Sequence, residues 1–130
     1  MTAKNLFTFV AFISVLFGAG LAFATPYMAQ LYLTNPGWLN PASTLMAQGW
    51  GALLIATAAG CWYVRTDGPS VGRNAMLVLL VITNLGWTVM HLVALLGGVE
   101  TPMAWLQVGM TAVVGSWATM LLRQPTGVVA

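Results

Sequence analysis

The sequence has very few charged residues. Only six of its 130 residues are Lys, Arg, Asp or Glu, which is 5% of the chain, whereas 59% are hydrophobic. A soluble domain usually carries about a quarter charged residues, so this composition excludes an ordinary soluble domain and predicts an integral membrane protein. The net charge of +2 comes without a basic run, and no nucleic-acid partner is expected.

Residues that carry chemistry are equally scarce. Cys61 is the only cysteine and His91 the only histidine, which excludes an internal disulfide and gives no metal-site spacing. No Asp or Glu falls inside a long apolar stretch, so the usual carboxylate of proton-coupled transport is missing. No nucleophile–base arrangement or phosphate loop occurs. These absences favour a protein that is not an enzyme, and no catalytic residue is predicted.

Four apolar stretches are long enough to cross a hydrocarbon core of about 30 Å, which takes ~20 residues. They cover residues 6–24, 41–63, 75–96 and 102–122. Each is predicted to be a helix, because backbone polar groups must be paired inside lipid. Short connections make sequential helices antiparallel neighbours. The sequence therefore predicts an all-α integral membrane protein, with residues 1–130 forming one up-down bundle of four transmembrane helices.

The first stretch has a second interpretation. Lys4, the apolar run and Ala22-Phe23-Ala24 also fit a signal peptide with its cleavage site. Gly18-Ala19-Gly20 with Ala22 suits close helix contact instead, which favours a retained helix. Cleavage would leave three spans with unchanged orientation.

The orientation follows from the loops. All Lys and Arg residues fall on one side of a four-span bundle, and the opposite side receives only Glu100. The positive-inside rule then places both termini in the cytoplasm. We expect a multi-pass protein of a bacterial inner membrane with the lipid bilayer as its surroundings.

Three residue pairs in the outer loops, each ending in proline, predict where helices begin. Residues 26–34 are predicted to form a short interfacial helix in the first outer loop, because Thr25-Pro26 reads as a cap and first helical residue and the loop is aromatic. This segment is an anchor or, alternatively, a lid over an outward-facing pocket. Asn40-Pro41 and Thr101-Pro102 give the same signal for the second and fourth long helices.

Small residues predict helix contacts. In the second and fourth long helices they are Ala52, Ala56, Gly60, Ala112 and Ser116, and such residues let membrane helices approach closely.

Three polar side chains are predicted to share one level on the outer side. At about 1.5 Å per residue, His91, Gln48 and Gln107 each lie roughly 8 Å outward of their helix centres. They either hydrogen-bond one another across the bundle or line a polar-tipped pocket with His91 as ligand or proton carrier, where Trp87 lines the cavity. The pocket would hold a quinone-like molecule, a lipid or a tetrapyrrole; bis-His haem is excluded because a second histidine is lacking.

Asn84 lies closer to the midplane. Spacings of three, four and seven put Asn84, Trp87, Thr88 and His91 on one helix face. Ser116 and Ser14 fall at a similar depth to Asn84, and we expect one of them to be its structural partner.

The chain resembles the DoxX-like group of small four-helix bacterial membrane proteins. The likeness rests on residues 18–26 (GAGLAFATP), 48–52 (QGWGA) and 84–87 (NLGW), and otherwise on hydropathy and spacing. The resemblance implies a four-helix inner-membrane protein and, as an alternative function, a membrane subunit of a quinone-linked oxidoreductase, which a few members of the group are. It transfers no catalytic residue.

Together these patterns predict a non-catalytic accessory or structural subunit of a larger inner-membrane complex, respiratory or photosynthetic, packed against other membrane subunits or itself. The small loops leave little soluble surface for independent chemistry. The alternative is a quinone-like or lipid-binding membrane subunit of an oxidoreductase that uses the pocket around His91. A passive carrier or channel is disfavoured by the absence of carboxylates within the spans.

Overall fold

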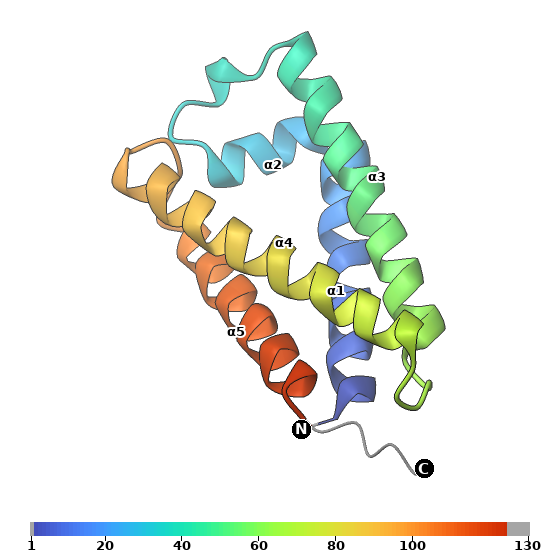
Figure 1. Ribbon diagram of the computed structural model, residues 1–130. Coiled ribbons are helices and arrows are strands. Elements are labelled where there is room, and N and C mark those ends of the chain that lie inside the picture. The colour runs from blue at the N-terminus through green and yellow to red at the C-terminus, as the bar shows by residue number, and fades with distance from the viewer. Residues whose placement is uncertain (1, 125–130) are drawn as a thin grey trace, which may run out of the picture.

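The protein is mainly helical in the part that the computed structural model describes, residues 2–124 (Figure 1). Four helices are long and apolar enough to cross a membrane, which confirms the all-α class and the four candidate spans. The elements in chain order are α1 (Ala3–Phe23), α2 (Thr25–Tyr32), the 3₁₀ turn η1 (Pro36–Trp38), α3 (Pro41–Val64), α4 (Val71–Leu96) and α5 (Ala104–Leu122).

Side-chain caps, rather than hydropathy, mark the start of α1, α3 and α4. Asn40 caps α3 as predicted: its side chain accepts the N–H of Ser43, and the Ser43 hydroxyl accepts the N–H of Asn40. Ser70 caps α4 in the same way by accepting the N–H of Arg73. Helix α4 therefore starts before the apolar run does, four residues ahead of the predicted position 75.

Two predicted caps are wrong. Thr25 lies inside α2, and its hydroxyl donates to the carbonyl of Leu21 in the preceding helix. Thr101 precedes α5 by three residues and donates instead to the carbonyl of Leu31. Thr25 therefore bonds back to the last turn of α1, whereas the partner of Thr101 is 70 residues away and is not revealed by local sequence.

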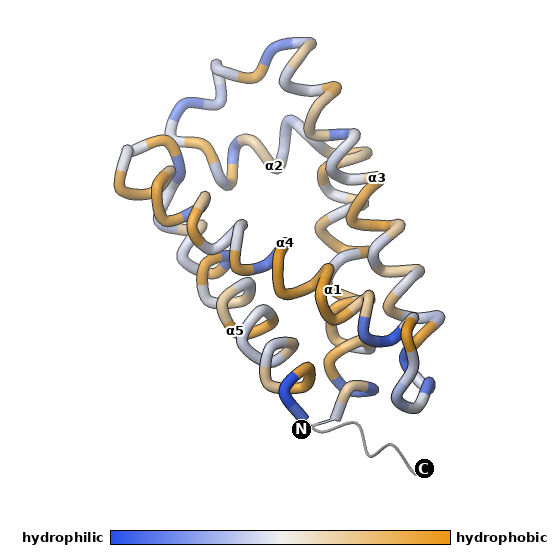
Figure 2. Tube along the Cα trace, viewed as in Figure 1, coloured by the Kyte–Doolittle hydropathy of each residue, from blue (hydrophilic) through white to orange (hydrophobic). Residues whose placement is uncertain are grey.

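The long helices form two antiparallel pairs instead of one evenly packed bundle. Helix α1 packs chiefly against α3, and α4 chiefly against α5. The two pairs converge where α3 turns into α4, and they diverge toward the end that α2 crosses (Figure 1). Figure 2 shows apolar residues along the helices and hydrophilic residues mainly at loops and helix ends.

The core lies at the converging end. It contains residues from all four long helices: Leu6, Phe7, Val10, Ala11, Ala58, Cys61, Val64, Leu77, Leu80, Val114, Ala118 and Leu121. Packing density is what holds helices together in lipid, since lipid tails are as apolar as leucine. The converging end is therefore where the two helix pairs are packed together.

Glycines allow α1 and α3 to touch backbone to backbone. A Cβ at Gly51 would lie 2.6 Å from the Gly18 oxygen and 2.7 Å from the Ala22 nitrogen, so only glycine fits there. This confirms the predicted close contact of Gly18 and Ala22. The predicted packing face of α3 is partly wrong, because Ala52 and Ala56 are exposed.

Candidate functional site

The histidine forms an ion-pair contact: His91, near the end of α4, meets Glu100, in the turn before α5. Nδ1 of His91 lies 2.9 Å from both carboxylate oxygens, and each side chain is 14% exposed. An ionised carboxylate only accepts hydrogen bonds, so Nδ1 carries the hydrogen and donates. The pair fixes the orientation of the imidazole and leaves Nε2 for another partner.

The predicted layer of His91, Gln48 and Gln107 is not a hydrogen-bonded network. Gln48 is exposed on α3, and the hydrogen bonds of His91 within residues 2–124 go to Glu100. Counting residues along each helix gave the position of each side chain along the helix axis but not the direction in which the side chain points. Helices α3 and α4 also diverge at this position. Glu100 was missed as a site residue because it lies outside the apolar stretches.

Gln107 approaches Tyr32 instead. The pKa of the Tyr32 phenol is raised above its ordinary value. Burial is the main cause, hydrogen bonding with Gln107 partly opposes it, and the negative charge of Glu100 adds to it. Tyr32 is the last residue of α2. The candidate site therefore combines α2, α4, the α4–α5 turn and α5.

Two tryptophans extend the site toward α3. The Trp87 ring stacks on the His91 imidazole, with centroids 5.3 Å apart and an interplanar angle of 28°. Trp50 of α3 meets Trp87 edge to face at 5.2 Å. Trp87 thus lies beside His91, as its predicted place on the same helix face requires, and the Trp50 contact links the two helix pairs.

A backbone strap holds α2 over this site. We use "strap" for residues 31–34, which pair with residues 98–101 of the α4–α5 turn. Leu33 and Glu100 form an isolated antiparallel bridge. Further hydrogen bonds run from Thr34 N to Val99 O (3.0 Å), Thr101 N to Tyr32 O (2.8 Å), Thr101 Oγ1 to Leu31 O (2.6 Å) and Thr34 Oγ1 to Gly98 O (2.7 Å).

Asn84 has a different partner from the one predicted. Its side chain donates to the carbonyl of Leu80 in its own helix, and Ser116 is exposed on α5. Ser14 is buried on α1, and α1 is not the helix that α4 chiefly packs on. The polar link between α4 and α5 is made by Thr88 and Thr111, whose hydroxyls lie 2.8 Å apart.

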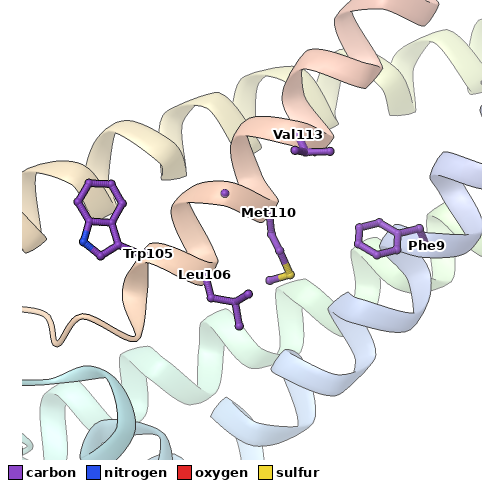
Figure 3. A pocket seen from close by; sticks show the side chains of 6 residues that line it. Phe9, Trp105, Leu106, Met110 and Val113 are labelled. Atoms are coloured by element: carbon purple, nitrogen blue, oxygen red, sulfur yellow. The ribbon is translucent and has the colours of Figure 1, made fainter.

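Two shallow hollows lie elsewhere, along α5. A shallow apolar groove of about 380 Å³ runs between α1 and α5, and Figure 3 shows Phe9 and Met110 facing each other across it. A second groove of about 320 Å³ includes Ala112, Ser116 and Trp117. Neither contains His91. Within the described residues, no three side chains of the metal-binding types cluster.

No protein-family model, curated protein or solved structure matches the chain. Its function is therefore inferred from its own residues and geometry.

Proposed function

We propose that the chain is a non-catalytic structural subunit of a larger assembly in a bacterial inner membrane. Its termini and the α3–α4 turn would lie on the cytoplasmic side, since Lys4, Arg65, Arg73 and Arg123 all fall at that end of the four candidate spans and cytoplasmic loops are rich in Lys and Arg.

The observation that carries this proposal is the uncovered small-residue face of α5. Gly109, Ala112 and Ser116 are spaced by three and four and so share one face, and they line the two grooves. A Cβ at Gly109 would meet nothing within 4 Å. Such faces let helices approach closely in lipid.

Gly115 differs from Gly109 because it is packed against α4. A Cβ there would lie 2.7 Å from Leu85 Cδ2, so this glycine is already used by the contact between α5 and α4. Helix α5 therefore has one small-residue contact filled within the chain and a second face that is free for another membrane helix.

The proposal is tested by purifying the full chain in mild detergent from the membrane that naturally holds it. We expect a stoichiometric complex with other membrane proteins. Gly109→Leu should reduce partner recovery at least several-fold, because the side chain fills the groove. Gly49→Leu is the matched control, since a Cβ at Gly49 also meets nothing within 4 Å. A stable wild-type monomer, or equal loss in both variants, would overturn the proposal.

The orientation is tested separately by labelling single cysteines in a Cys61→Ala background with a membrane-impermeant maleimide. We expect Asn35→Cys to react in intact spheroplasts and Asp67→Cys to react only after permeabilisation. The reverse pattern would contradict the proposed topology.

A further inference from the structure

The imidazole of His91 is held in one orientation but has a hydrogen-bonding atom to spare. Its hydrogen bonds within residues 2–124 all involve Nδ1. The buried side-chain atoms without a partner in that part of the chain are Arg73 Nε and Trp117 Nε1, so Nε2 of His91 is not sealed in the core. A carboxylate that fixes one ring nitrogen in this way orients the other toward a ligand.

Flat aromatic surfaces lie beside this atom. Trp87 stacks on the imidazole, and Trp50 meets Trp87 from the other helix pair. Aromatic rings favour offset-stacked or edge-to-face neighbours with centroids ~4.5–7 Å apart. A planar ring that enters between α3 and α4 can therefore continue the series of rings that is already present.

The Tyr32 phenol supplies a second polar group. Burial, Gln107 and the Glu100 charge all act on this phenol, and its ring packs beside Phe17 of α1, with centroids 6.3 Å apart. A neutral phenol donates one hydrogen bond. The strap ties the backbone of Tyr32 to Thr101, the residue after Glu100, so the position of the phenol depends on α2 staying in place.

The charged residues near the site determine which kind of ligand head group fits. Glu100 is the acidic residue of this end, whereas the Lys and Arg residues lie at the opposite ends of the long helices. A phosphate head group would meet the Glu100 carboxylate without a compensating cation, and like charges repel. An uncharged head with carbonyl or hydroxyl oxygens avoids this cost.

We infer that His91, Tyr32, Trp87 and Trp50 form a head-group site for an apolar molecule whose planar ring carries carbonyl or hydroxyl oxygens, the chemical class of the membrane quinones. Nε2 of His91 bonds one ring oxygen and the Tyr32 hydroxyl donates to another. The tail lies between α3 and α4, which leave most of their apolar length uncovered. The site requires the chain to lie in a membrane but does not depend on the assembly role of α5.

The test uses the full chain in phosphatidylcholine nanodiscs, titrated with a short-tailed ubiquinone while tryptophan fluorescence is recorded. We expect saturable quenching. His91→Gln and Trp87→Leu should each weaken binding about tenfold, the effect of losing one good contact. Gln48→Ala is the control, because Gln48 lies at the same level but is exposed, and it should bind like the wild type.

Several results would overturn the site. Wild-type affinity in both His91→Gln and Trp87→Leu would do so, provided that circular dichroism shows both variants folded. If His91→Gln does not fold, the Trp87→Leu variant decides the test, because it keeps the His91–Glu100 pair. Competition by phosphatidylglycerol, or by a ring-free isoprenoid alcohol as strongly as by the quinone, would show that the ring is not recognised. A Soret band in the purified protein would assign the site to a tetrapyrrole instead.

Discussion

At the scale of single residues, His91 and Glu100 depend on each other for hydrogen bonding. Both side chains are largely withdrawn from solvent, and a carboxylate that loses its partner in such a place keeps its desolvation cost. The pair is therefore expected to contribute to stability as a unit.

A double-mutant cycle measures this coupling. His91→Leu should destabilise the protein by about 1–3 kcal/mol, the cost of an unsatisfied buried polar group. The double variant His91→Leu/Glu100→Leu should cost clearly less than the sum of the single changes. Unfolding by denaturant in detergent gives the free energies, and strict additivity would show that the two side chains do not interact.

Tyr32 predicts a loss of stability at high pH. Its phenol has a folded-state pKa above the ordinary value of 10.0, so the folded protein holds this proton more tightly than the unfolded chain does. The resulting stability is complete below pH ~10 and declines as the pH rises through the ordinary pKa toward the folded one. Tyr32→Phe should flatten the alkaline part of a melting-temperature profile, with the exposed Tyr27→Phe as the control for removing a phenol.

Two neighbouring glycines of α3 should respond in opposite ways to alanine. Gly51→Ala places a methyl group against the backbone of α1, and overpacking costs roughly 1–3 kcal/mol. Gly49→Ala meets nothing within 4 Å and should be neutral or gain up to about 1 kcal/mol from helix propensity. Unfolding midpoints in detergent compare the two; equal effects would contradict the backbone contact.

At the scale of elements, hydropathy predicted that the long helices exist, whereas the exact starts of α1, α3 and α4 coincide with polar capping side chains. The run from Pro41 was bounded correctly because its cap, Asn40, is local. Thr101 has the same residue pattern but serves a contact with Leu31, 70 residues away in the chain. A pattern of a few residues cannot show whether such a polar side chain caps its own helix or bonds to a distant segment.

The strap is predicted to be the most easily opened connection. Thr34→Ala and Thr101→Val together remove its side-chain hydrogen bonds but leave the backbone pairs. We expect the amides of Thr34 and Thr101 to exchange hydrogen at least tenfold faster, since each lost bond contributes about 1 kcal/mol. Thr57→Val is the control because its hydroxyl bonds only within α3. Unchanged exchange in the double variant would show that the backbone bonds alone hold the strap.

At the scale of the whole molecule, the two helix pairs are joined by the core at one end, and by the strap and the Trp50–Trp87 contact toward the other. Spin labels at Leu45 and Val93, both exposed and near the α2 end, should report a broad distance distribution. Labels at Tyr63 and Met120, exposed at the converging end, should report a narrow one. The strap variants should broaden only the first distribution, and equal widths would contradict an opening at the α2 end.

The pairing of helices explains why the site was only partly predictable. Composition and run length identify four spans and the face that holds Trp87 and His91, because both are properties of single helices. They do not say that α1 pairs with α3, or that α2 reaches the α4–α5 turn. The partner of His91 is only nine residues away, but it depends on how the α4–α5 turn folds back on the end of α4, which run length does not give.

The strap also constrains how the protein is made. Residues 31–34 are synthesised long before residues 98–101, so the backbone groups of Tyr32 and Thr34 that the turn later satisfies have no such partner while α3, α4 and the turn emerge from the ribosome. Hydrocarbon would penalise these unsatisfied groups by several kcal/mol each. In a membrane-inserted chain, α2 would therefore stay in contact with water until the α4–α5 turn has emerged, and the strap can close only after α3 and α4 have been made.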